Sequence, residues 1–407
     1  MRLLHVSDFH VGVRKHGLDR RPDHDHVFAQ IKAIAIEERV DVILNTGDTF
    51  DEPYPSIEVL RYGWSVLEEL ASVAPVVVVC GNHDGGKLLE LMSTILKSRL
   101  PIHFIEPSSL MRGAEAIVTV PSSAGESIRI GAVPFIKTAS FMRDYLGGDA
   151  GRATVTYAEN VGSLELLVGQ HLNANYDARR DIRVFAAHLL IDGAQVSGSE
   201  YRFHVESDFA TKADRIPIAD YVGFGHIHKP QTIAGVPHGR YAGSPIPIDF
   251  GEVADQKSVF LVTGKPGFSL DIQPRNLDVG RPFVDVRGTL DDIAFNRERY
   301  RNAIARVFVD LDAPLSDLDS RVRDLLPDTK VCVVKPRYHD VEDSGALKAS
   351  VGEREPTLSE MFGVYLAGKP EKGDPKVVQR YFDELLDRVE GGRLDDASFA
   401  DIDEAIA

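Results

Sequence analysis

Five short motifs of this chain carry carboxylate, amide and imidazole side chains, the groups that bind divalent metal ions and transfer protons. The motifs are SDFH, GDTFD, GNHD, the histidine that ends VFAAH, and GFGHIH. Their candidate site residues, in chain order, are Asp8, His10, Asp48, Asp51, Asn82, His83, His188, His226 and His228. Mixed imidazole and carboxylate ligation, with no sulfur, suits Mn, Fe or Zn rather than Mg or Ca alone.

Two of the motifs place their candidate ligands two residues apart. Asp8 and His10 have this spacing, and so do His226 and His228. On an extended strand it puts both side chains on one face, as two ligands of one ion require. Each motif alone also has an ordinary structural explanation, such as a loop, a helix cap, a turn or a core histidine.

Taken together, the motifs supply enough nitrogen and oxygen for two cations. Two metal ions about 3.5–4 Å apart activate a water molecule and stabilise both oxygens of an in-line displacement. Phosphoester hydrolysis is the reaction class that uses this arrangement. His24 and His26 have a similar spacing, but they open an amphipathic helical pattern, and we interpret them as helix-start residues.

The elements that must position these residues alternate between apolar strands and amphipathic helices. We expect strands at 3–8, 40–48, 74–84 and 101–106, and helices at 27–39, 57–71 and 88–98. This alternation favours an α/β domain with largely parallel pairing. Three motifs fall where a strand ends, and ligands of open α/β sheets gather beyond the carboxyl ends of strands.

The sequence of the rest of the chain predicts further strands and then a second, separate pattern of strands and helices. We expect a helix and a polar loop at 150–180, then strands at 182–192, 221–228 and 257–264. A β-α-β-α-β pattern follows, with its first helix at 292–305, and a polar linker follows at 339–356. The expected domains are 1–270, a small second domain at 280–340, and a C-terminal helical segment at 356–407.

Bulk composition fits a globular protein of the cytoplasm. The 407 residues are 43% hydrophobic and 27% charged, and no apolar run approaches the roughly 20 residues that cross a bilayer. Only two cysteines are present, Cys80 and Cys332, which excludes a disulfide framework and a cysteine-rich zinc site. The formal charge of −16 argues against a chain that coats nucleic acid unaided.

The ordered series D-x-H, GDxxD, GNHD, H and GHxH resembles the calcineurin-like metallophosphoesterase superfamily. The stretches LLHVSDFHVG, HLLIDGAQVSGSE and RYAGSPIPIDFGE further resemble nucleases of the SbcD/Mre11 type, over about residues 1–260. The resemblance implies a four-layer α/β/β/α sandwich, a smaller α+β cap domain that faces DNA, and a C-terminal helical segment.

The resemblance also implies roles for the motif residues. One ion would be held by Asp8, His10, Asp48 and His228. The second ion would be held by Asp48, Asn82, His188 and His226, with Asp48 bridging. His83 matches the catalytic histidine, Asp51 would orient His83, and Asp84 is expected to cap the following helix.

The activity implied is that of a DNA-repair nuclease with two divalent metal ions, expected to be Mn²⁺. It would act as a double-strand exonuclease and single-strand endonuclease in complex with an ATPase of the SbcC/Rad50 type, as a homodimer. Helical patterns at 358–368 and 377–389 are the candidates for docking the ATPase. The alternative is a small-molecule phosphodiesterase or phosphatase with the same metal core, which the extra domain and helical tail argue against.

Overall fold

The computed structural model describes residues 1–96, 100–111, 117–135, 157–197 and 210–338, together with Gln379 and Phe382. The chain divides into two compact units, Met1–Arg337 and Tyr338–Ala407. Every strand and helix described below belongs to the first unit, apart from the last residue of one strand. The expected linker at 339–356 and the C-terminal segment at 356–407 lie outside the described residues, except for Gln379 and Phe382.

The first of two six-stranded sheets has the strand order β14-β13-β1-β2-β3-β4. Its strands are β1 Arg2–Val6, β2 Val42–Asn45, β3 Val76–Val79, β4 Ile102–Ile105, β13 Ser258–Thr263 and β14 Asp271–Asn276. Strands β1 to β4 pair in parallel, and β13 and β14 run antiparallel at one edge. The parallel α/β arrangement expected for the first third of the chain is therefore confirmed.

The second six-stranded sheet has the order β11-β12-β10-β7-β6-β5. Its strands are β5 Ile117–Pro121, β6 Ser127–Val133, β7 Asp181–His188, β10 Tyr221–Gly225, β11 Gln231–Ile233 and β12 Val236–Tyr241. The expected strand at 182–192 is interrupted, because β7 ends at His188 and a separate strand, β8 Leu190–Ile191, pairs with β9 Ala210–Thr211.

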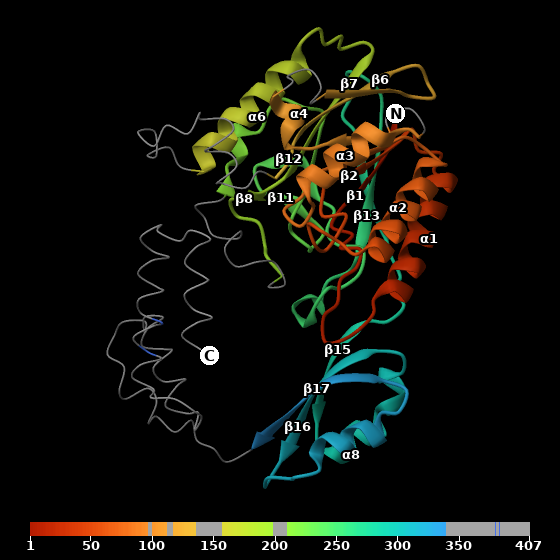
Figure 1. Cartoon of the computed structure of the whole chain (residues 1–407), viewed down its shortest axis with the longest axis vertical. Coiled ribbons are helices and arrows are strands. Elements are labelled where there is room, and N and C mark those ends of the chain that lie inside the picture. The colour runs from red at the N-terminus through yellow and green to blue at the C-terminus, as the bar shows by residue number, and fades with distance from the viewer. Residues whose placement is uncertain are drawn as a thin grey trace, which may run out of the picture. The chain divides into compact units, whose positions relative to one another are not determined.

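The two sheets stack face to face, with helices on both outer faces (Figure 1). Alternate residues such as Leu3 and Val77 of the first sheet meet Ile130 and Val184 of the second in an apolar core. The outer helices are α1 Arg21–Glu37, α2 Ile57–Ala71 and α3 Gly86–Leu96 on the first sheet, and α4 Pro107–Met111 and α6 Tyr157–Asn173 on the second. This is the expected four-layer α/β/β/α sandwich. None of the described helices is long and apolar enough to cross a membrane.

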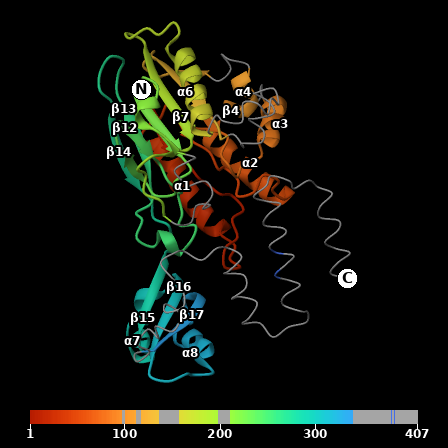
Figure 2. The same ribbon diagram turned by 90° about the vertical axis from the view of Figure 1, so that its left-hand side faces the viewer.

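A small domain follows the sandwich, built on a three-stranded sheet in the order β15-β16-β17 (Figure 2). Its elements are β15 Phe283–Gly288, α7 Leu290–Phe295, β16 Ile304–Leu311, α8 Leu318–Leu325 and β17 Lys330–Tyr338. The helix expected at 292–305 is shorter than predicted: α7 ends at Phe295, a 3-10 turn covers Arg297–Tyr300, and the chain then enters β16. Ala305 faces the apolar core of this domain from the strand.

The small domain contacts the sandwich through one apolar and one ionic cluster. Phe283 packs edge-on against Phe250 with ring centroids 4.7 Å apart. Arg281 donates to both oxygens of Asp23, at 2.6 and 2.8 Å. The same carboxylate accepts from Arg20, which is 1% exposed and lies against the Phe283 ring.

Candidate metal centre

All five motifs lie at the carboxyl ends of strands, at one rim of the sandwich. The loops after β1, β2 and β3 carry the motifs of the first sheet, and His188 and the loop after β10 carry those of the second. Parallel strands end on the same side of a sheet, so stacking two such sheets brings both sets of loops together. The expectation that the motifs share one rim is confirmed.

The expectation that each pair of ligands shares a strand face is wrong. Asp8 and His10 have φ of 51° and 46°, and His226 has φ of 94°, so these residues lie in left-handed turns beyond the strand ends. The loop after β1 is instead held along the loop after β2, where Asp8 N donates to Gly47 O and His10 N donates to Asp48 O, both at 2.9 Å. Left-handed non-glycine residues are costly and gather at functional sites.

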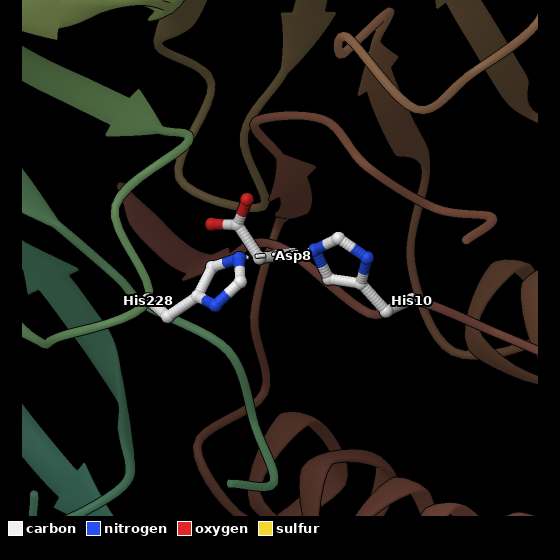
Figure 3. A group of neighbouring side chains, drawn as sticks. All are labelled: Asp8, His10 and His228. Atoms are coloured by element: carbon white, nitrogen blue, oxygen red, sulfur yellow. Dashed lines mark hydrogen bonds between the residues drawn. The ribbon is translucent and has the colours of Figure 1, made fainter. Parts of the chain in front are cut away.

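The first group of ligand atoms comes from Asp8, His10 and His228, whose side chains converge in Figure 3. Nε2 of His10 approaches Nε2 of His228 to 3.1 Å. Asp8 Oδ1 accepts from His226 N at 3.0 Å, whereas Asp8 Oδ2 is buried and has no hydrogen-bond partner among the described residues. Two facing imidazole nitrogens and an unpartnered buried carboxylate oxygen fit a cation, because a buried charge needs a partner of opposite sign.

The second group is built around Asn82 and Asp48. Asn82 Oδ1 lies 2.8 Å from His188 Nε2 and 2.9 Å from His226 Nδ1. Asp48 Oδ2 lies 3.3 Å from His188 Nε2 and 3.6 Å from His10 Nε2. A single oxygen of Asp48 thus stands between the two groups of ligands.

The carboxylates and imidazoles of the centre shift one another's pKa values. Burial raises the pKa of Asp48, but the neighbouring His188 and His83 rings outweigh it and hold that pKa well below its usual range. Burial lowers the pKa of His188, but Asp48 and then Asp8 outweigh it and raise the pKa to about 9. The imidazole rings therefore favour the ionised form of Asp48, as a divalent cation beside it also would.

His83 is half-buried and forms a further group of potential ligand atoms with His10 and Asp48; its ring centroid lies 4.7 Å from that of His10. Its Nδ1 donates to the main-chain carbonyl of Asp51 at 2.7 Å, and its main-chain N donates to Asp48 Oδ1 at 2.8 Å. The Asp51 carboxylate points elsewhere, with Oδ1 2.9 Å from His10 Nδ1. Asp51 therefore contacts His83 through its backbone and His10 through its side chain.

Asp84 does not cap helix α3, contrary to the expectation from sequence. Its carboxylate accepts from the main-chain N–H groups of Thr49, Phe50 and Gly81, at 3.0–3.2 Å. These three N–H groups bind both oxygens of the carboxylate. Asp84 therefore connects the loops after β2 and β3 instead of capping helix α3. Burial and the nearby charge of Asp48 raise the pKa of Asp84 to about 6.

Three further residues contact the centre and were not assigned a role from sequence. Glu252 Oε1 lies 3.1 Å from His228 Nδ1, and Glu252 Oε2 accepts from Lys257 and Ser244. Burial raises the pKa of Glu252, but the Lys257 ammonium and the His228 ring outweigh it and hold the pKa below its usual range. The signal available was an acidic residue in RYAGSPIPIDFGE and a lysine directly before an apolar strand.

The histidines set aside from sequence have structural contacts. His24 is buried, and its Nε2 donates to Phe9 O at 2.7 Å. His5 contacts the hydroxyl groups of Tyr221 and Thr46 between the two sheets. His26 is exposed. None of these three belongs to the ligand groups found among the described residues.

Comparison with known proteins identifies the family of this chain. The calcineurin-like phosphoesterase family matches residues 1–230, more than half of the 407-residue chain. The SbcD subunit of the SbcCD nuclease of Escherichia coli K12 is 28% identical over 373 residues, covering 89% of this chain and 90% of that protein. The SbcD protein of Bacillus subtilis 168 is 29% identical over 289 residues, covering 70% of this chain and 71% of that protein.

Among solved structures, a dimetal phosphatase from Danio rerio aligns with a TM-score of 0.38 and 11% identity, over 68% of this chain and 96% of that one. The family match covers the strands and loops that carry Asp8, His10, Asp48, Asn82, His83, His188, His226 and His228. The chain belongs to the calcineurin-like phosphoesterase family.

Proposed function

We propose that this chain is a DNA nuclease with a two-metal centre, acting as the nuclease subunit of a complex with an ATPase. The observation that carries the proposal is the position of Asp48 Oδ2 between His188 Nε2 at 3.3 Å and His10 Nε2 at 3.6 Å. One carboxylate oxygen between two sets of ligands is the arrangement needed to bridge two cations.

The proposed ligands form two sets. The first ion is assigned to Asp8, His10, Asp48 and His228. The second ion is assigned to Asp48, Asn82, His188 and His226. The ions would be divalent, and we propose Mn²⁺ because the set mixes imidazole with carboxylate and amide oxygen.

When bound, two such ions supply a nucleophilic water and neutralise charge that develops on the phosphate oxygens. The chain itself orients the reacting groups. The carbonyl of Asp51 only accepts hydrogen bonds, so the Nδ1 of His83 carries a hydrogen and the ring is fixed in one orientation. We assign the proton transfer to the leaving oxygen to the other ring nitrogen, Nε2. His83→Gln should therefore keep the ligands in place while removing the proton donor.

The choice of DNA as substrate, and of an ATPase as partner, rests on the relatives. Two SbcD proteins, each named as part of an SbcCD nuclease, share 28–29% identity with this chain over most of its length. Their name describes one subunit of a two-component nuclease, and we propose the same assembly here. The net charge of −16 agrees with a chain that relies on a partner for much of its DNA affinity. The homodimer expected from sequence remains a prediction, which light scattering on the purified chain checks.

The test is cleavage of an end-labelled linear duplex by the purified chain with Mn²⁺, beside the His83→Gln variant. We expect nucleotide release by the wild type, a decrease of about 100-fold or more in the variant, and two bound Mn²⁺ in both. A variant that loses a metal ion would contradict the role assigned to His83.

A simple diester, bis(p-nitrophenyl) phosphate, separates the remaining outcomes. Hydrolysis of the diester without cleavage of DNA, even after the ATPase is added, would refute the nuclease and favour a phosphodiesterase that acts on a small molecule. Cleavage of DNA that appears only with the ATPase would support the proposed complex.

A further inference from the structure

A buried polar network lies directly behind the proposed metal ligand His228. Its members are Ser244, Glu252 and Lys257, which are 0%, 0% and 1% exposed, and His228 itself, which is 4% exposed. Charged side chains this deeply buried are rare unless they are paired, and keeping them ionised in the interior has a cost that packing alone does not explain. We infer that Glu252, held by Lys257 and Ser244, is a positioning residue that fixes the orientation and tautomer of His228 for metal binding.

The three donor hydrogens of Lys257 have three acceptors. Its Nζ donates to His228 O at 2.9 Å, to Ser244 Oγ at 3.0 Å and to Glu252 Oε2 at 2.5 Å. The hydroxyl of Ser244 in turn donates to Glu252 Oε2 at 3.2 Å. Two donors on one carboxylate oxygen leave the other oxygen, Oε1, to face the imidazole.

The network therefore contacts His228 at both ends of the residue. Lys257 binds the main-chain carbonyl, and Glu252 Oε1 lies 3.1 Å from the ring nitrogen Nδ1. An ionised carboxylate only accepts hydrogen bonds, so this contact requires a hydrogen on Nδ1. The lone pair of neutral His228 is then on Nε2, the atom that lies 3.1 Å from His10 Nε2 in the ligand group.

Two other ligands are oriented in the same way, which makes the arrangement systematic. His10 Nδ1 lies 2.9 Å from Asp51 Oδ1, and His188 Nδ1 lies 2.8 Å from Thr46 O. In each ring one nitrogen contacts a protein oxygen and the other points toward the centre. A metal-binding histidine whose second nitrogen is held in this way is pre-oriented and more basic, and losing the holding group typically costs 10–100-fold in metal affinity.

The experiment compares charge-neutral double variants, because removing one partner would leave the other charge buried and unpaired. Glu252→Leu with Lys257→Met removes both charges and the acceptor for His228. Glu252→Gln with Lys257→Met removes both charges but keeps a carbonyl oxygen. Asp220→Leu with Arg183→Met is the control, because it removes a partly exposed ion pair outside the network, with 3.0 Å between Arg183 Nη2 and Asp220 Oδ1.

The readout is Mn²⁺ binding to metal-free protein by titration calorimetry, with thermal unfolding in EDTA as a check on folding. The inference rests on the proposed two-metal centre, so the wild type is titrated first. Absence of Mn²⁺ binding by the wild type contradicts that centre. With a wild type that binds two ions, we expect the leucine variant to bind one of them about 10–100-fold more weakly, and the glutamine variant and the control to stay near the wild type.

Wild-type affinity for both ions in a folded leucine variant would overturn the inference. A second measurement observes the ring in the wild-type protein itself. It is long-range ¹H–¹⁵N NMR of metal-free protein labelled with ¹⁵N-histidine, with the His228 signal assigned by its loss in His228→Ala. We expect the neutral His228 ring to carry its hydrogen on Nδ1. A ring with its hydrogen on Nε2, the form usual for histidine in water, would refute the role of Glu252.

Discussion

Replacement of Gly81 by alanine tests the geometry of the metal centre through a single methyl group. Gly81 lies in the GNHD loop, and its φ is outside the left-handed region, so alanine is compatible with the backbone. A Cβ at this position would lie 2.1 Å from Asp48 Oδ1 and 2.3 Å from the main-chain N of Asp48. Any effect of the substitution must therefore come from displacing Asp48.

The size of the effect follows from these distances. A Cβ atom essentially never lies closer than 3.0 Å to another heavy atom, so the loops after β2 and β3 must separate by about 1 Å. A misplacement of about 1 Å in a catalytic site costs on the order of 100-fold in rate, or about 3 kcal/mol of transition-state stabilisation. The methyl group also overpacks a closed site, and we expect the free energy of unfolding to fall by about 1–2 kcal/mol.

The assay is Mn²⁺-dependent hydrolysis of bis(p-nitrophenyl) phosphate, with bound Mn²⁺ counted by elemental analysis. Gly86→Ala is the matched control, because a Cβ there would meet its nearest neighbour, Pro107 Cδ, at 3.4 Å, an ordinary van der Waals contact. We expect the control to match the wild type and Gly81→Ala to lose at least one ion and most of its activity. Two bound ions and the wild-type rate in Gly81→Ala would show that Asp48 is not held where we describe it.

Three further predictions address one ligand, one buried carboxyl group and the C-terminal segment. His188→Ala should lose one of the two Mn²⁺ ions, because it removes the imidazole whose Nε2 lies 3.3 Å from Asp48 Oδ2. His103 is exposed, so the control variant His103→Ala should still bind both ions. Elemental analysis of bound Mn²⁺ measures both variants. Burial raises the pKa of Glu165 from its ordinary 4.5 to about 7, so the folded state binds the extra proton and stability falls as pH rises across that interval. Glu165→Gln should remove up to about 3 kcal/mol of this fall, measured by urea unfolding in EDTA at about pH 5 and about pH 8; an unchanged slope would contradict it. Deletion of the residues after Pro356 should abolish binding to the ATPase and preserve hydrolysis of the simple diester; capture of the ATPase by the truncated chain would refute the docking assignment.

The parts of the fold that were predictable are those with strong apolar runs. Strands β1, β2 and β3 are fully buried except for Arg2 at the start of β1. Their apolar residues identify them, although β1 contains His5 and β2 ends in Asn45. Strand β14 was not recognised because its sequence, DIQPRN, is mostly exposed at an edge of the sheet. Strands β5 and β6 were missed as well, and only partner strands far away in the sequence show that they belong to the second sheet.

The convergence of the candidate residues at one rim was predictable, but their local geometry was not. Residue type and motif order identified His188, which ends a buried strand as expected. The two-residue spacing of Asp8 and His10 suggested a strand, but sequence does not reveal that both adopt left-handed turns against a neighbouring loop. The role of Glu252 was not predictable for another reason. Its partners are Lys257 and the ring of His228, 24 residues earlier, and no local sequence pattern identifies a buried ion pair.

The 3-10 turn Phe250–Glu252 touches two parts of the protein at once. Phe250 packs against Phe283 of the small domain, and Arg306 of that domain lies over the Phe250 ring. Two residues further on, Glu252 reaches the ring of His228. With Glu252 holding His228 as we infer, docking of the small domain and metal affinity would be linked equilibria. Linkage is reciprocal: the factor by which displacing the domain weakens metal binding would equal the factor by which losing the metal loosens the domain. On that inference, a substrate that displaces the small domain is expected to change metal affinity without contacting any of the proposed ligands.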